Sequence, residues 1–332
     1  MRNKWLWIIL AIAVVITVVL VLANIEPEPI SEIEEPIELK EIKIGYLSGT
    51  ATQFGLPILV AKEKGFFREE GLEAKLIEAE PATAAPALLS GEIDYSPFST
   101  TEITASLKGA SISSVMLTSK GPYHILVAQP GLEINELKTI GISFLNTPPH
   151  YQALKFMKEY NLELEIIASG TPAATVAMLV RGDVDAIITV DLRAVQLQAE
   201  GFQLLKKFDD IYPSILSTKK EKIENNPEEV QGVINALQKS IEYILQTGPE
   251  EISEFMLKHF GMNATEENLK LVKSAYPFIV KELDRRGLAV DEGIEIVIKH
   301  SKAGNYQTLQ DIEGQTVTQE EIRQVFDSRF VE

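Results

Sequence analysis

Apolar residues follow two alternating periods along the chain from Glu41 onward. Short segments with an apolar residue at every second position predict β-strands. Longer segments in which apolar residues recur every three to four positions predict helices. Because strands and helices alternate, the pattern predicts an α/β protein with parallel sheets and right-handed crossovers.

The boundaries of these elements follow from the period and from glycines that end helices. We expect strands at residues 41–47, 72–77, 93–96, 112–117, 124–128, 139–143, 164–167, 186–190 and 203–206. We expect helices at residues 57–69, 83–90, 100–107, 149–160, 173–180 and 193–200. Beyond residue 215 the pattern predicts mainly helices, at residues 227–246, 249–259, 265–275 and 290–302.

Two helix-to-strand junctions have the same form. Residues 87–94 read ALLSGEID and residues 178–185 read MLVRGDVD, so each has an apolar helix end, a glycine, an acid, an apolar residue and an aspartate. We interpret the two segments as parts of related α/β units, which suggests two lobes with a cleft between them. The alternative is that the four residues glycine, acid, apolar residue and aspartate simply form a favourable turn from helix to strand.

The N-terminal residues predict a membrane anchor. Residues 5–23 are apolar except for Thr17, which is close to the length of a spanning helix. Arg2 and Lys4 precede them, so the N-terminus should be cytoplasmic and the rest extracytoplasmic, as in a single-pass protein of the cell membrane. A cleaved signal peptide is the alternative. Residues 24–40, rich in Glu and Pro, predict an extended linker.

Composition excludes several kinds of site. The chain has no cysteine, which excludes disulfides, a lipid-bearing cysteine and any Cys-ligated metal. Its four histidines show no H-E-x-x-H spacing, so we expect no metal and no cofactor. The formal net charge of −17 argues against nucleic acid as a partner, because phosphates need a basic surface.

Four segments resemble the solute-binding proteins of ABC importers for nitrate, sulfonates, taurine and thiamine-pyrimidine precursors. They are AKEKGFFREEGL at residues 61–72, LLSGEID at 88–94, GDVDA at 182–186 and VFDSRF at 325–330. The resemblance runs over residues 41–330, and the segments occur in the family's order.

This resemblance implies a type II periplasmic-binding-protein fold with two hinged, Rossmann-like lobes and a helical C-terminal region. Lobe I would comprise residues 41–128 plus 207–332, and lobe II residues 129–206. It implies a monomer that carries a small organic solute, such as a sulfonate, carboxylate or heterocycle, to an ABC permease driven by a cytoplasmic ATPase. Two alternatives stay open: an enzyme of thiamine- or menaquinone-type biosynthesis on the same fold, and a ligand sensor without a transporter.

The ligand should bind beyond the carboxyl ends of the strands, where helices begin. Hydroxyl groups there can donate to ligand oxygens, aromatic rings can hold a planar ligand, and the Arg193 guanidinium suits a carboxylate or sulfonate. The candidate ligand-binding residues are Thr50, Thr52, Gln53, Phe54, Phe98, Ser99, Thr100, Thr101, Thr147, His150, Tyr151, Thr171, Asp191 and Arg193.

Each candidate also has a structural interpretation. Serines and threonines at helix starts commonly cap the helix. The aromatic residues can belong to the core, and Arg193 can pair with Asp191 or Glu200 at the surface. Lys120 and His124, near the expected crossing between lobes, are weaker candidates.

Overall fold

The computed structural model describes Trp5 and residues 38–47, 55–119, 124–145, 147–208, 214–259, 263–288 and 318–330. The expected anchor apart from Trp5, most of the linker and the expected helix at residues 290–302 lie outside these ranges. In the ranges that are described, no helix combines the length and apolar character needed to cross a membrane. Residues 39–332 form one compact unit.

The first sheet has six strands in the order β11-β4-β10-β3-β1-β2. They are β1 (Lys40–Tyr46), β2 (Leu72–Glu78), β3 (Tyr95–Ser96), β4 (Ile112–Ser119), β10 (Ser214–Lys219) and β11 (Leu283–Leu288). β1 is parallel to β2 and β3, whereas β10 is antiparallel to both β3 and β4. β11 is also antiparallel to β4. β10 and β11 were not expected as strands, and because of them the expectation of a parallel sheet is wrong for this sheet.

The second sheet has five strands in the order β7-β6-β8-β5-β9. They are β5 (His124–Ala128), β6 (Thr139–Ile142), β7 (Glu165–Ala168), β8 (Ala186–Val190) and β9 (Gln203–Lys207). β5 is antiparallel to β8 and β9, so this sheet is also mixed. The expected first lobe ended at residue 128 and so included β5. The strand pairing instead places the change of sheet between Ser119 and His124.

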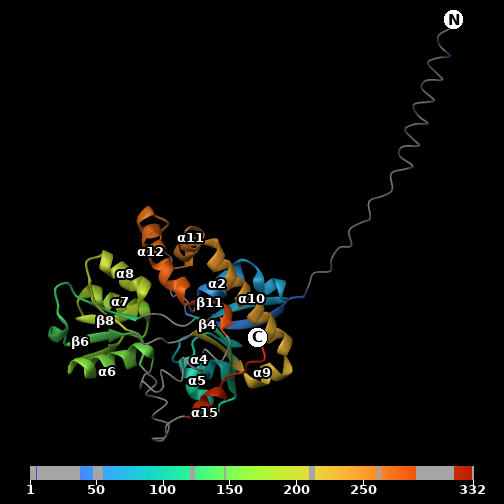
Figure 1. Ribbon diagram of the computed structural model, residues 1–332, viewed down its shortest axis with the longest axis horizontal. Helices are drawn as coiled ribbons and strands as arrows, with labels where there is room; N and C mark the ends of the chain where they lie inside the picture. The colour runs from blue at the N-terminus through green and yellow to red at the C-terminus, as the bar shows by residue number, and fades with distance from the viewer. Residues whose placement is uncertain are drawn as a thin grey trace. The chain divides into compact units, whose positions relative to one another are not determined.

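The helices cover both faces of the two sheets (Figure 1). They are α2 (Leu56–Glu63), α3 (Phe66–Glu69), α4 (Ala84–Ser90), α5 (Thr100–Leu107), α6 (Pro148–Tyr160), α7 (Pro172–Arg181), α8 (Asp191–Ala199), α9 (Lys220–Asn225), α10 (Pro227–Thr247), α11 (Pro249–His259), α12 (Glu266–Glu282) and α15 (Gln319–Arg323), with a 3-10 turn, η1, at Ile134–Glu136. The expected helix at 57–69 is two helices, because Gly65 at φ 81° breaks the first.

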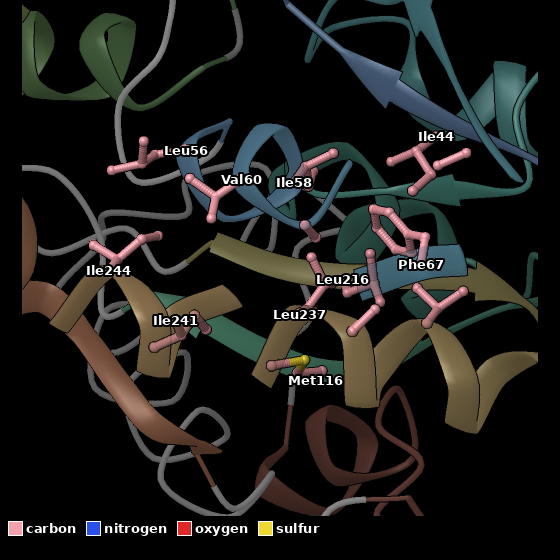
Figure 2. Close-up of a cluster of buried hydrophobic side chains, with 14 of the residues drawn as sticks. Ile44, Leu56, Ile58, Val60, Phe67, Met116, Leu216, Leu237, Ile241 and Ile244 are labelled. Carbon is pink, nitrogen blue, oxygen red and sulfur yellow. The ribbon is translucent and has the colours of Figure 1, made fainter. Parts of the chain in front are cut away.

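The largest core cluster lies on one face of the first sheet. Leu237, Ile241 and Ile244 form an apolar stripe on α10, at spacings of four and three residues. Figure 2 shows these side chains together with those of β1, α2 and α3. Phe67 of α3 is 1% exposed within this cluster. The helical return of the chain thus completes the core of the first sheet.

The second sheet has an apolar cluster on each face. Ala186 and Ile188 of β8 pack on the side of α6, while Ile187 between them packs on the side of α7 and α8. Successive residues of a strand point to opposite faces, so a strand buried on both sides reads as a continuous apolar run. α6 lies on one face and α7 and α8 on the other (Figure 1).

The two repeated junctions share one backbone geometry. Gly91 and Gly182 each end a helix at φ 78°, a left-handed conformation that favours glycine. The aspartate three residues later then accepts a hydrogen bond from the backbone of a neighbouring strand. Asp94 Oδ2 accepts from the Lys43 amide at 2.8 Å, and Asp185 Oδ2 accepts from the Thr139 amide at 2.9 Å. The motif therefore joins a helix end to the parallel strand beside it in both sheets.

The C-terminal motif at residues 325–330 contacts the first sheet. The Ser114 amide of β4 donates to the Val325 carbonyl at 2.9 Å, and the Asp327 amide donates to the Ser114 carbonyl at 2.8 Å. The backbone of β4 therefore forms hydrogen bonds with this C-terminal segment as well as with the neighbouring strands of the sheet.

Candidate functional site

The described members of the ligand-binding set all lie at the carboxyl ends of strands, whereas the weaker candidate His124 is the first residue of β5, beside the end of β8. Phe98 to Thr101 follow β3, Thr147 to Tyr151 follow β6, Thr171 follows β7, and Asp191 and Arg193 follow β8. Thr50, Thr52, Gln53, Phe54 and Lys120 lie outside the described residues. For Thr100 and Asp191 the structure gives the backbone position alone, each as the first residue of a helix.

Both chain crossings leave the first sheet beside the loop that follows β3. Ser119 at the end of β4 pairs with Ser214 at the start of β10. The Ser214 hydroxyl donates to the Pro97 carbonyl at 2.9 Å. The crossings therefore begin next to the candidates of the first sheet.

The same crossings reach the second sheet beside its own candidates. The Phe208 amide donates to the His124 carbonyl at 2.9 Å, and His124 pairs with Val190, the last residue of β8. From Ser119 to His124 the chain advances five residues, and each residue spans at most about 3.6 Å. The candidate edges of the two sheets are thus joined by short covalent connections.

The loop after β3 contains a strained serine. Ser99 has φ 79° and ψ −58°, in the γ-turn region that side-chain-bearing residues rarely adopt. Its carbonyl accepts a hydrogen bond from the Ile103 amide at 2.9 Å, so Ser99 is the N-cap residue of α5. Backbone strain of this kind costs about 1–3 kcal/mol and is concentrated at functional sites.

Sequence reasoning missed the residue that organises this loop, Glu102. Its side chain is 0% exposed, and its carboxylate accepts from the hydroxyls of Ser96 and Thr101, the latter at 2.9 Å. Burial raises the pKa of Glu102, while these hydroxyls and the backbone of Ser99 act in the opposite direction. Ser99-x-x-Glu102 has the spacing of a capping box, and this was the available signal.

Replacing Ser99 by glycine should raise the free energy of unfolding by about 1 kcal/mol. Glycine adopts a positive φ without a Cβ penalty, although it also increases the entropy of the unfolded chain. Urea unfolding measures the difference. Replacing Ser99 by valine should destabilise the protein, because a β-branched residue is poorly tolerated at positive φ. A Ser99→Gly variant that is less stable than the wild type would show that the backbone there is not strained.

Two other candidates of this loop have structural contacts. Phe98 is 7% exposed and packs with Ala79 and Ala84 in a small apolar cluster. Thr101 Oγ1 lies 2.7 Å from the Pro81 carbonyl oxygen and 2.9 Å from Glu102 Oε2, so its single hydrogen is shared between these two acceptors. Both side chains therefore hold the loop in place.

The helix starts of the second sheet also use their own hydroxyls. The Thr147 hydroxyl donates to the Phe144 carbonyl at 2.7 Å, and the Thr171 hydroxyl accepts from the Ala174 amide at 3.1 Å. α6 begins with Pro148 and Pro149, which have no amide hydrogen to offer a ligand. The expected supply of backbone donors is therefore smaller at α6 than at an ordinary helix start.

A hydroxyl cluster at this edge was not predicted. Thr175 Oγ1 lies 3.1 Å from Ser143 Oγ and 2.6 Å from Ser169 Oγ. Ser143 follows β6, Ser169 follows β7, and Thr175 is one turn into α7, where it is 1% exposed. The cluster fixes α7 against the carboxyl ends of two strands. A serine directly after each strand was the sequence signal.

The aromatic and basic candidates are partly or fully covered. The rings of His150 and Tyr151 have centroids 5.6 Å apart, and burial lowers the pKa of His150. Arg193 donates to Gln196 Oε1 at 2.9 Å. Burial lowers the pKa of Arg193, and Glu200 acts in the opposite direction. A guanidinium near the start of α8 is well placed to attract an anion to this edge.

Comparisons with known proteins give the family and the fold. The family model described as NMT1/THI5 like matches residues 53–252. No curated protein matches the chain. Among solved structures, the aliphatic sulphonate binding protein SsuA of Escherichia coli has a TM-score of 0.66 at 17% identity, over 87% of this chain and 97% of its own.

Two further structures are similar at lower identity. The nitrate-binding protein NrtA of Synechocystis PCC 6803 has a TM-score of 0.66 at 12% identity, over 88% of this chain and 87% of its own. A cysteine-to-serine mutant of DSZB in complex with biphenyl-2-sulfinic acid has a TM-score of 0.55 at 14% identity, over 86% of this chain and 99% of its own. The chain belongs to the NMT1/THI5-like family, and its fold is that of the type II periplasmic binding proteins.

Proposed function

We propose that the protein binds a small organic solute outside the cytoplasm and delivers it to an ABC permease. Family membership and the similarity to periplasmic binding proteins for sulphonate and nitrate support this function. The observation that carries it is the edge of the second sheet, where three helices begin after three strands. His150 and Tyr151 lie at the start of α6, after β6, and Arg193 lies at the start of α8, after β8. Such an edge suits an oxyanion attached to a small organic group.

Closure of two lobes would couple binding to transport. We take lobe I as the first sheet with its helices and lobe II as residues 124–208. Two short crossings join them, and short segments at element ends are the usual hinges. The solute would lie between the edge that carries Ser99 and the edge that carries Arg193. The permease, with its ATPase, would then recognise the closed form.

The tether belongs to the same proposal. Residues 5–23 would hold the protein at the membrane, and the acidic linker would let the lobes move beside the permease. Cell fractionation tests this point. The full chain should sediment with membranes and leave them when residues 1–23 are deleted. A full chain released as a shorter, soluble form would instead show a cleaved signal peptide.

An enzymatic function receives less support. The similar structure of DSZB is that of a mutant in which serine replaces a cysteine, so the unmutated DSZB has a cysteine at that position. The present chain has no cysteine. No side chain at the described candidate edge therefore provides a thiol nucleophile.

A thermal-shift screen tests the proposed function. A specific solute should raise the melting temperature through mass action, in a panel of sulfonates, nitrate, bicarbonate and pyrimidines. Replacing Arg193 by methionine should weaken binding of an anionic solute about 10- to 100-fold, since a hydrogen bond to a charged group contributes about 1.5–3 kcal/mol. Arg181→Met, which removes an exposed guanidinium paired with Asp183, is the matched control. A panel that leaves the melting temperature unchanged at millimolar concentration would contradict the proposal.

A further inference from the structure

Gln152 has a buried side-chain amide without a hydrogen-bond partner among the described residues. Its side chain is 0% exposed, and neither Nε2 nor Oε1 has a hydrogen-bond partner among the residues that the structure describes. Buried polar side chains nearly always have a partner, and an unpaired one is costly. Two unpaired atoms on one fully buried amide therefore need an explanation.

The position of Gln152 places it at the candidate edge. It lies in the second turn of α6, directly after Tyr151, and one turn before Phe156 on the same face. Phe156 packs edge-on against Phe208, with ring centroids 6.4 Å apart. The Phe208 amide bonds to His124, which begins the second sheet beside the carboxyl end of β8.

Helix geometry directs the amide toward the same edge. Side chains of a helix tilt toward its N-terminus, so the Gln152 side chain covers the turn that contains Pro148. This turn follows β6 and also carries His150 and Tyr151. The unpaired amide therefore lies on the side of α6 where the solute is proposed to bind.

We propose that Gln152 binds the solute and selects one that presents an N–H donor beside a C=O acceptor. This inference rests on the proposed function. The Gln152 amide offers one acceptor, Oε1, and two donors on Nε2. A sulfonate or nitrate has acceptors only and would leave Oε1 unpaired. A lactam edge, as in a pyrimidine, or a primary carboxamide would satisfy both ends of the amide with two parallel hydrogen bonds.

Arg193 and Gln152 would then bind different parts of the same solute. Arg193 attracts an oxyanion at the start of α8, and Gln152 binds the amide-like edge at α6. A site that pairs its own polar groups with a solute rejects analogues that lack the matching donor, because the buried group would stay unpaired. Gln152 thus selects the solute by its hydrogen-bonding groups, while Arg193 attracts its negative charge.

Two measurements on the full-length protein test this role. Without added solute, Gln152→Met should raise the melting temperature, because an unpaired buried amide is replaced by an apolar group of similar length. Gln198→Met, which changes an exposed glutamine of α8, is the matched control and should leave it unchanged. A lower melting temperature for Gln152→Met would show that the amide is satisfied inside the protein, by buried water for example, and would overturn the inference.

The second measurement uses defined solutes. Uracil and nicotinamide carry a donor beside an acceptor, whereas nicotinate and ethanesulfonate carry acceptors only. Calorimetric titration should show that uracil or nicotinamide binds the wild type and binds Gln152→Met about 10- to 100-fold more weakly. If only nicotinate or ethanesulfonate binds, with equal affinity for both proteins, the proposed function stands and the role of Gln152 is wrong. If none of these solutes nor any in the earlier panel binds, both proposals fail.

Discussion

Replacing Glu229 by alanine is expected to lower the free energy of unfolding by about 3–5 kcal/mol, the cost of removing one partner from a buried ion pair. The Glu229 side chain is 3% exposed in the first turn of α10. Lys222 contacts its Oε1 at 2.9 Å, and Lys40 contacts its Oε2 at 2.7 Å. The Tyr95 hydroxyl donates to Oε1 at 2.8 Å. Alanine would leave the Lys222 ammonium and the Tyr95 hydroxyl without this acceptor.

The effect should be large because the network joins distant parts of the first sheet. Lys222 also pairs with Asp94, at 2.9 Å, and Asp94 accepts a hydrogen bond from the Lys43 amide in the middle of β1. One carboxylate therefore connects β1, the repeated junction, α9 and α10. The second sheet has the equivalent of Asp94, in Asp185, and its carboxylate accepts from the backbone of Lys138 and Thr139.

The pH dependence of this network has a definite sign. Burial by itself would raise the pKa of Glu229, but hydrogen bonds from Lys40, Lys222 and Tyr95 lower it below the ordinary value of 4.5. A lowered pKa in the folded state means that the stabilisation is present above pH 4.5 and is lost as the pH falls through the folded value. The stability lost in Glu229→Ala should therefore shrink in acid.

Urea unfolding of the full chain between pH 3 and pH 7, about the range of carboxylate titration, measures both effects. Glu228→Ala is the matched control, since Glu228 is the exposed neighbour in the same helical turn. It should change the unfolding free energy by less than about 0.5 kcal/mol. A Glu229→Ala variant as stable as Glu228→Ala would show that the buried charges contribute no net stability.

The sequence predicted some features well because local rules decide them. The repeated junctions at Gly91 and Gly182 needed only the preference of glycine for a left-handed cap, and the structure confirms both helix ends. The helix at 227–246 had a clear apolar stripe and is present as α10. The alternation of strands and helices likewise gave the α/β class.

Other features depended on tertiary context. β10 has the sequence SILSTK, and five of its six residues are buried. Its serines and threonine interrupt the apolar pattern by which a buried strand is recognised in a sequence. Their hydroxyls are paired inside the sheet, as in Ser114 with Ser217 at 3.0 Å and Thr218 with the Asp94 carbonyl at 2.8 Å. No local pattern shows such pairing, so the antiparallel centre of the first sheet was missed. The candidate loops were placed by topology, but which hydroxyls are already paired depended on the structure.

The second large effect concerns Glu102, the buried acid beneath the loop after β3. Replacing it by alanine should lower the free energy of unfolding by about 3 kcal/mol, because the hydroxyl of Ser96 loses a buried acceptor and the backbone of Ser99 loses a capping partner. The same change should loosen the loop that carries Ser99. We therefore expect Glu102→Ala to weaken solute binding even though Glu102 itself is fully buried.

Its pH dependence is opposite in sign to that of Glu229. Burial raises the pKa of Glu102 above the ordinary value of 4.5, so the folded protein binds this proton more tightly than the unfolded chain. The resulting stabilisation is full below pH 4.5 and is lost as the pH rises through the folded value. Glutamine cannot ionise, so Glu102→Gln should differ from the wild type by a constant amount in acid.

Unfolding curves for the wild type, Glu102→Gln and Glu102→Ala between pH 4 and pH 8, about the range over which a raised carboxyl pKa titrates, distinguish these effects. As the pH rises, Glu102→Gln should gain stability relative to the wild type. The reason is that the wild type loses the stabilisation that came from the tightly bound proton of Glu102 and must then bury a charged carboxylate, whereas glutamine carries no charge at any pH. Glu102→Ala should stay less stable than Glu102→Gln at every pH. A difference between wild type and Glu102→Gln that does not change with pH would mean that Glu102 keeps its ordinary pKa. The loop would then be held by an ionised carboxylate.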